Sequence, residues 1–126
     1  MESPIKTVRI SQTGAERLNQ LKRVTKIPHM NTLCRWALCY SLAESSIPSP
    51  VKLESDSKIE IAWDTFGGEN ADLLLAALKV RCHRDGLPGD EETLKTQFSL
   101  HLHRGLAYLA EQEELTDIEQ LVKLAV

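Results

Sequence analysis

Near its start the chain has a stretch in which apolar and polar residues alternate strictly. Val8 and Ile10 lie on one side of this pattern. The opposite side carries Thr7, Arg9 and Ser11. Alternation with a period of two is typical of a strand that buries one face. Residues 7–11 are therefore predicted to form a short strand with one polar face.

The period changes to that of a helix between Gln12 and Lys26. At about 100° per residue, one side of this segment is apolar and the opposite side is basic. The apolar side holds Leu18, Leu21 and Val24. The basic side holds Lys22, Arg23 and Lys26. The pattern predicts a first helix that is amphipathic and basic.

A second helix is predicted after Pro28, which breaks the first one. Asn31 is a good N-cap for this helix, which runs to about Ser45. Its positions are apolar on nearly every side, so we expect it at the centre of the fold or in a subunit interface. Arg35 lies within this apolar helix and needs a polar partner, because burying an unpaired charge is costly.

The stretch from Ser45 to Pro50 predicts a linker, since its two prolines exclude a regular helix. Residues 58–63 then alternate again at first, with Ile59 and Ile61 on one face, and predict a second strand. The two short strands could pair with each other and so satisfy backbone groups that neither satisfies alone. The sequence leaves open whether this pairing occurs within one chain.

Further helices are indicated towards the C-terminus. The pair Gly67–Gly68 marks a turn before a helix over residues 70–84. The apolar side of that helix holds Leu74, Leu75, Leu78 and Cys82. Asp90 caps a long helix that follows. The apolar row of the long helix is Leu94, Phe98, Leu102, Leu106 and Leu109. Gly105 beside this row allows close helix packing, and a last short helix is predicted to begin at Thr116.

These elements predict a mainly α fold, in which a strand and two helices are extended by a second short strand and two to three further helices. At 126 residues the chain is expected to form a single domain, 1–126. Within it, residues 6–46 form a basic unit, 47–57 a linker and 58–126 an acidic, mostly helical part. No apolar run is long enough for a membrane span and no signal-peptide layout is present, so a cytoplasmic location is expected.

Positive charge is concentrated in the first 46 residues. They contain seven Lys or Arg and three acidic residues, a net charge of +4, whereas the remaining residues contain eight and fifteen, a net charge of −7. Such asymmetry points to one end that faces a polyanion and another that solvates the protein or docks a partner. The candidate DNA-binding residues are Arg9, Arg17, Lys22, Arg23 and Lys26. The simpler alternative is a solvated helix face.

No residues have the spacing that a catalytic or metal site requires. His101 and His103 are two apart, so on a helix they point about 200° from one another and cannot share a metal ion. Cys34 and Cys39 do not form a CxxC pair, and with Cys82 they make an odd number, as expected of buried thiols in a reducing compartment. No Gly-rich phosphate loop is present. We therefore expect neither enzymatic activity nor a metal or cofactor.

The order of elements over residues 6–46 is similar to that of the ribbon-helix-helix repressors. In that family two chains pair their strands into a ribbon that enters the major groove. Carried onto this chain, the residues that would read bases are Thr7, Arg9 and Ser11. Backbone amides near Asn31 would be available to a phosphate. This resemblance implies a sequence-specific transcriptional regulator, and a structural adaptor that docks protein partners is a further alternative.

The chain as a whole more closely resembles the DndE family, the small E component of bacterial DNA phosphorothioation systems. The resemblance spans about residues 6–110. It is carried by Val8-Arg9-Ile10-Ser11, Leu21-Lys22-Arg23-Val24-Thr25, Asn31-Thr32-Leu33-Cys34-Arg35-Trp36-Ala37-Leu38, Tyr40-Ser41-Leu42, Leu78 to Cys82, Asp85-Gly86-Leu87, His101-Leu102-His103-Arg104-Gly105-Leu106 and Tyr108-Leu109-Ala110. One position departs, since Lys26 stands where the family has a glycine after the first helix.

This resemblance implies a non-catalytic subunit of the complex that replaces a non-bridging phosphate oxygen of DNA by sulfur. The family is described as tetrameric and as favouring nicked duplex DNA through surface lysines. Lys22, Arg23 and Lys26 would then hold the DNA backbone in several copies at once. The sulfur chemistry and the ATP hydrolysis would belong to other proteins of the complex. A DNA-binding accessory subunit is therefore the leading hypothesis.

Overall fold

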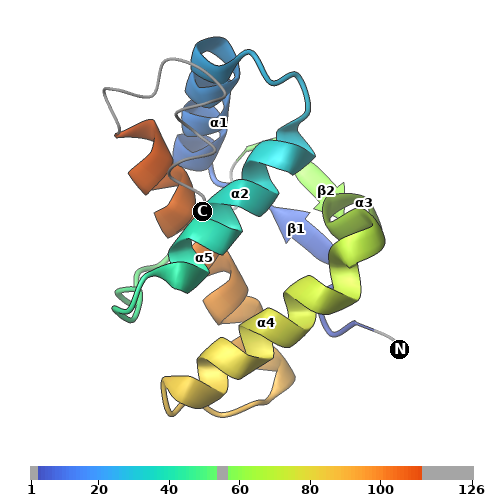
Figure 1. Ribbon diagram of the computed structural model, residues 1–126, viewed down its shortest axis with the longest axis vertical. Helices are drawn as coiled ribbons and strands as arrows, with labels where there is room; N and C mark the ends of the chain where they lie inside the picture. The colour runs from blue at the N-terminus through green and yellow to red at the C-terminus, as the bar shows by residue number, and fades with distance from the viewer. Residues whose placement is uncertain (1–2, 54–56, 112–126) are drawn as a thin grey trace.

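The computed structural model describes residues 3–53 and 57–111. Its elements, in chain order, are β1 (Thr7–Arg9), α1 (Gln12–Thr25), α2 (Met30–Ala43), β2 (Glu60–Ala62), α3 (Trp63–Gly67), the 3-10 helix η1 (Gly68–Asn70), α4 (Ala71–Arg84) and α5 (Glu91–Ala110). Four long helices thus accompany one small sheet in this part of the chain (Figure 1). The predicted mainly α fold is confirmed.

The two strands pair with each other inside one chain. They run antiparallel, and the register places Thr7 opposite Ala62, Val8 opposite Ile61 and Arg9 opposite Glu60. The backbone N–H of Trp63 continues the ladder by donating to the carbonyl of Lys6 at 2.9 Å. One edge of β1 is therefore occupied within the chain, which decides the pairing that the sequence left open.

The first strand is shorter than predicted because the chain turns into α1 directly after it. β1 ends at Arg9, while Val8 and Ile10 are both buried. Ser11 was predicted on the outward face of the strand, and this was wrong. Its hydroxyl accepts a hydrogen bond from the N–H of Gly14 at 3.0 Å, so Ser11 is the N-cap of α1 and is itself buried.

The second helix lies at the centre of the fold, as its apolar composition predicted. α2 packs most extensively against α5 and also contacts α1, α3 and α4. The predicted N-cap Asn31 is wrong, because the helix begins at Met30 with His29 as N-cap. It also ends at Ala43 rather than near Ser45. The polar partner expected for Arg35 is the carbonyl of Phe66 in α3, which accepts from Nη1 at 2.8 Å.

A short helix that the sequence did not predict precedes α4. The predicted second strand stops at Ala62, and Trp63 begins α3. The ring of Trp63 stacks on Phe66 at a centroid distance of 5.6 Å, and both rings meet Phe98 of α5 edge-on at 5.4 Å. This aromatic group anchors α3 to the core, since aromatic pairs bury a large area in fixed geometry.

The central contact between α2 and α5 depends on a glycine. Asp90 caps α5 as predicted, accepting from the N–H of Thr93 at 3.2 Å. Further along, a Cβ placed on Gly105 would lie 1.8 Å from the carbonyl oxygen of Ala37. The predicted close helix packing at Gly105 is therefore confirmed, and α2 is the helix that it admits.

Two further predictions from the sequence concern a last C-terminal helix and membrane-spanning segments. The last helix predicted from Thr116 lies outside the described residues. Among the helices that the structure does describe, none is long and apolar enough to cross a membrane.

Candidate nucleic-acid interface

Three of the five candidate cations lie together at the C-terminal end of α1, at the top of Figure 1. Leu18 and Leu21 are buried and fix the phase of the helix. Lys22 is half-exposed, and the other two are exposed. These three residues, Lys22, Arg23 and Lys26, are called the α1 basic cluster below. Within residues 3–53 and 57–111, no carboxylate forms an ion pair with any of them.

The turn that presents the cluster has the geometry of a glycine turn, although Lys26 occupies it. Lys26 is the C-cap of α1, with a φ of 62° and a ψ of 18°. Its backbone N–H donates to the carbonyl of Lys22 at 2.9 Å. The hydroxyl of Thr25 accepts from the N–H of Ile27 at 3.2 Å and holds the next residue. The chain thus keeps the left-handed turn that favours glycine and adds a positive charge there.

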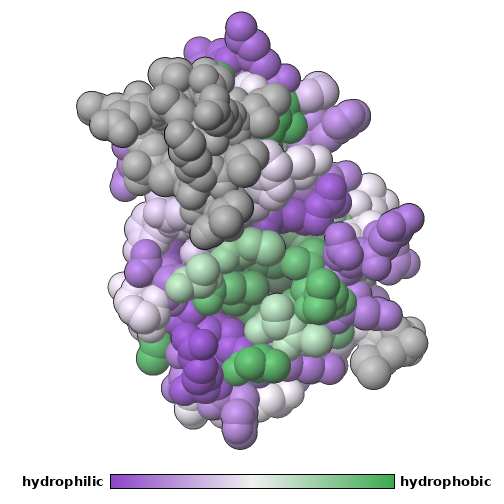
Figure 2. Space-filling view, viewed as in Figure 1, coloured by the Kyte–Doolittle hydropathy of each residue, from purple (hydrophilic) through white to green (hydrophobic). Residues whose placement is uncertain are grey.

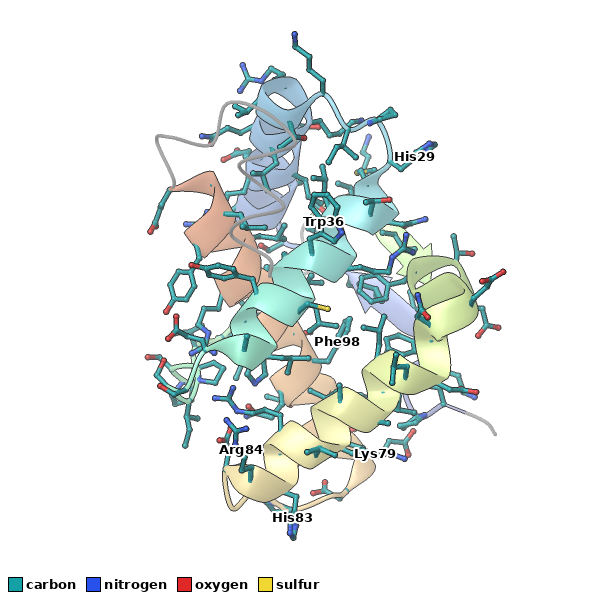
Figure 3. All side chains as sticks on the ribbon, viewed as in Figure 1. His29, Trp36, Lys79, His83, Arg84 and Phe98 are labelled. Carbon is teal, nitrogen blue, oxygen red and sulfur yellow. The ribbon has the colours of Figure 1, made fainter. Side chains whose placement is uncertain are left out.

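The cluster borders an open groove that also contains the start of α2. The groove has a volume of about 450 Å³. Its lining includes Lys22 from α1, His29, Met30 and Asn31 from the start of α2, and Glu60 from β2. His29 is labelled there in Figure 3. The side chain of His29 makes no capping hydrogen bond. The positive end of the α2 dipole and Lys22 therefore face the same space, an arrangement that suits a phosphate group.

The other two candidates, Arg9 and Arg17, are less suited to bind a polyanion. Arg9 forms an ion pair with Glu60 at 3.0 Å, both side chains being more than half exposed. Its guanidinium is thus paired with a carboxylate, which a phosphate would have to displace. Arg17 has the same intermediate exposure as Lys22 but lies near the buried His103, and its charge helps to lower the pKa of that imidazole, after burial, which is the main cause. The structure therefore brings together three of the five predicted cations and leaves these two apart.

A polar network that the sequence did not reveal joins α2 to α5. Nδ1 of His101 lies 2.8 Å from the hydroxyl of Ser41. That hydroxyl accepts a hydrogen bond from Nε of Arg104 at 2.8 Å, so its own hydrogen is available to His101. Ser41 and His101 are both 0% exposed. A nucleophile and its base must reach a substrate, so this serine–histidine pair is structural.

The second histidine serves a separate structural role. The backbone N–H of Ser11 donates to Nε2 of His103 at 3.1 Å, and Nδ1 of His103 lies 2.8 Å from the carbonyl oxygen of Ser99. His103 thus connects the start of α1 to α5, while His101 faces α2. The described residues contain no group of three His, Cys, Asp or Glu that could hold a metal ion.

The three thiols have different surroundings. Cys34 and Cys82 are buried, as expected, whereas Cys39 is exposed, contrary to the expectation of buried thiols. Burial raises the pKa of Cys34 to about 12, against the opposing effect of the Arg35 charge. Burial is also the main cause that raises the pKa of Cys39 and of Cys82. A thiol that stays protonated is a poor nucleophile, so none of the three is activated.

The buried network predicts that the free energy of unfolding decreases as the pH is lowered through a defined range. Burial, followed by the charges of Arg104 and Arg81, lowers the pKa of His101 from 6.5 to about 4. Between these values the unfolded chain binds a proton that the folded chain does not. Stability should therefore be lost as the pH falls from 6.5 to 4, by about 3 kcal/mol from this residue. Urea denaturation at several pH values measures the loss.

The matched variant is His101→Asn, whose amide oxygen can accept from Ser41 without titrating. Its stability should depend less steeply on pH over the same range, with His103 supplying the remaining slope, because the pKa of His103 is also lowered by burial. An unchanged slope in His101→Asn would contradict the assignment.

Comparison with known proteins agrees with the fold and with the resemblance inferred from residues 6–110. The family model described as DNA sulphur modification protein DndE matches residues 7–117. Among solved structures, the chain is similar to DndE from Escherichia coli B7A, described as involved in DNA phosphorothioation modification. The TM-score is 0.67 at 23% identity, and the match covers 82% of this chain and 95% of that chain. The comparison with curated proteins gave no match. Since the family model spans most of its length, the chain belongs to the DndE family of DNA sulphur modification proteins.

Proposed function

We propose that this protein is a DNA-binding, non-catalytic subunit of the DNA phosphorothioation system. Family membership supports the role in the system. The observation that carries the DNA contact is the α1 basic cluster, three cations without an ion pair among the described residues, beside the uncapped start of α2. Phosphate contacts from such groups are independent of base sequence. The protein therefore holds the backbone of duplex or nicked DNA.

A non-catalytic role is supported by the surroundings of the reactive side chains. The serine–histidine pair of α2 and α5 is enclosed, and burial keeps the thiols protonated. The sulfur chemistry then belongs to other proteins of the complex, with which this chain associates. A homo-oligomer, in this proposal a tetramer, presents several copies of the α1 basic cluster to one DNA and gains affinity through multivalency.

The ribbon-helix-helix regulator receives less support from the geometry. Base reading by Arg9 would require its side chain to leave Glu60, and Ser11 is committed to capping α1. The edge of β1 that pairs with β2 is also closed to a second chain. Backbone holding is therefore the function that these residues support best.

Changing Lys22, Arg23 and Lys26 together to Glu is expected to abolish most of the DNA affinity. Each phosphate contact contributes about 0.9 to the slope of log K against log salt concentration, so the slope should fall by about three. Titration of nicked and intact duplexes at several salt concentrations measures both quantities. Unaltered affinity and slope would refute the site, and a preference for one operator sequence would favour the regulator instead.

Two further variants sharpen this experiment. Changing Lys52, Lys58 and Lys95 to Glu alters the net charge equally at exposed positions away from the cluster, and should leave most of the slope intact. Lys26→Gly removes one charge but suits the left-handed turn at φ 62°. It should lower the slope by about one while keeping or raising stability, by roughly 0.5–1 kcal/mol. If Lys26→Gly lost both DNA binding and folding, Lys26 would be required for the conformation of the turn and not for its charge.

A further inference from the structure

The outer side of α4 is apolar, although it faces solvent in this chain. Leu73 is 67% exposed and Val80 is 64% exposed. They are seven residues apart and so lie on the same side of the helix, with Ala76 and Ala77, also exposed, between them. These four residues are called the α4 stripe below. Figure 2 shows a hydrophobic patch over α4 and the neighbouring part of α2.

The stripe is not part of the core of the chain. The predicted apolar side of this helix, Leu74, Leu75, Leu78 and Cys82, is indeed buried. The stripe lies on the opposite side of α4, where a surface helix normally carries polar residues. Single exposed aliphatic residues are common on protein surfaces, but a continuous exposed stripe marks an interaction surface.

We propose that the α4 stripe binds the α4 stripe of a second copy of this chain, with the two helices antiparallel about a two-fold axis. The axis passes between Ala76 and Ala77, so that Leu73 of each copy meets Val80 of the other. The small side chains at the axis allow close approach of the two helices, whose axes lie about 8–10 Å apart in such contacts. The inference rests on the proposed function in one respect, because it specifies a surface for the proposed self-association.

Charges beside the stripe favour this arrangement over a partner of unrelated sequence. Asp72, Lys79 and His83 lie on one flank of α4, within roughly 40° of each other about the helix axis. All three are exposed, and Asp72 and Lys79 form no ion pair with the described residues. His83 marks this edge of α4, away from α2, in Figure 3. In an antiparallel pair about a two-fold axis, this flank of one copy lies beside the same flank of the other copy.

The register then places opposite charges together. A residue at position i lies opposite position 153 − i of the other copy, so Asp72 lies opposite position 81. Lys79 and His83 of the other copy are each two residues from this point, about 3 Å along the axis. Asp72 thus falls between two basic groups, and the symmetry repeats the contact. A parallel pairing about a two-fold axis would instead put these flanks on opposite sides of the contact, so Asp72 would not meet Lys79 or His83 of the other copy.

The contact leaves the proposed DNA surface open. The α1 basic cluster and α4 lie at opposite ends of the molecule in Figure 1. Two copies joined through α4 would therefore leave both basic clusters outside the contact. Self-association at this stripe and phosphate binding at α1 can consequently be tested separately.

The test is the mass of the assembly measured by sedimentation or light scattering across a range of concentrations. Changing Leu73 and Val80 together to Glu should weaken the contact by at least ~100-fold in Kd, because burying two carboxylates from each copy within it is costly. The assembly should then fall to half its mass or less. Val51→Glu is the matched control, at an aliphatic residue that is 58% exposed beside α5, and should leave the mass unchanged.

A charge exchange keeps the test independent of folding. Asp72→Lys and Lys79→Glu should each weaken the association, and the double variant should restore it, since the opposite charges meet again. If the losses of association in the two single variants simply added up in the double variant, the antiparallel register would be overturned.

Unchanged mass in the Leu73 and Val80 variant would overturn the stripe while leaving the proposed DNA contact intact. A monomeric wild-type protein would overturn both the stripe and the proposed oligomer. Lost DNA binding in the α1 variant with unchanged mass supports the DNA contact, and a reduced mass in the Leu73 and Val80 variant supports the stripe.

Discussion

Gly105→Ala is expected to destabilise the protein by at least about 3 kcal/mol. The added Cβ would lie 1.8 Å from the carbonyl oxygen of Ala37 and 2.4 Å from its carbonyl carbon. Both are backbone atoms of α2, which cannot swing aside as a side chain can. Overpacking a core costs roughly 1–3 kcal/mol when side chains can adjust, and more when they cannot. The helices α2 and α5 would have to separate along the most extensive contact in the fold.

Gly89→Ala is the matched control for this variant. Apart from Gly89 itself and its two chain neighbours, no described atom lies within 4 Å of a Cβ at this position. Urea denaturation of the two variants should therefore separate steric exclusion from the general effect of replacing glycine, which reduces the freedom of the unfolded chain. Equal midpoints for both variants would show that α2 and α5 are not packed through Gly105. Failure of Gly105→Ala to fold, with a stable Gly89→Ala, agrees with the expected result.

Arg81→Ala is expected to cost about 3–5 kcal/mol. Arg81 is 3% exposed. Its Nε donates to the carboxylate of Asp85 at 2.9 Å, and the side chain of Asp85 is itself 8% exposed. The guanidinium also donates to the backbone carbonyls of Leu42, Glu44, Ser45 and Ser46. Truncation would leave a buried carboxylate and these carbonyls without their donor, and breaking such a buried pair is strongly destabilising.

The size of the loss should depend on the shape of the replacement. Arg81→Lys retains the charge but not the planar fork that reaches several carbonyls at once, so it should fall between Arg81→Ala and the wild-type protein. Arg23→Ala removes an exposed arginine of the α1 basic cluster and should change stability by less than about 0.5 kcal/mol. Denaturation midpoints of the three variants measure the series. A loss in Arg81→Ala no larger than in Arg23→Ala would contradict the buried role.

Arg81 also explains why α2 ends two residues earlier than the sequence indicated. The helix has no basic residue in its last turn, and Ala43 is followed by an extended Glu44. Carbonyls at this end are bound by Arg81 of α4 and by Arg104 of α5, whose Nη2 donates to the carbonyl of Ser41 at 2.8 Å. Arg81 and Arg104 lie dozens of residues after the end of α2 in the sequence. No local pattern at the end of α2 can therefore predict its cap.

The elements that local patterns predicted well are those in which periodicity alone decides the outcome. α1 occupies Gln12–Thr25, within a residue of the predicted limits, because its apolar side and the break at Pro28 are both local. Asp90 and its acidic neighbours mark the start of α5 in the same way. The α1 basic cluster followed directly from the phase of α1. The position of the cluster beside the start of α2 could not be predicted in this way, because it depends on the direction in which the chain leaves the turn at Lys26.

The sequence by itself determined the helices, the faces that they bury, the glycine required beside the apolar row of α5 and the family to which the chain belongs. Tertiary structure alone decided that β1 pairs with β2 in the same chain, that Ser41 meets His101 and that Arg81 caps α2. It also left the α4 stripe exposed, although Leu73, Leu74 and Leu75 are equally apolar in sequence. The physical reason is the same in each case. Periodicity records which side of an element is apolar, whereas hydrogen-bond partners and exposed faces depend on residues distant in the chain.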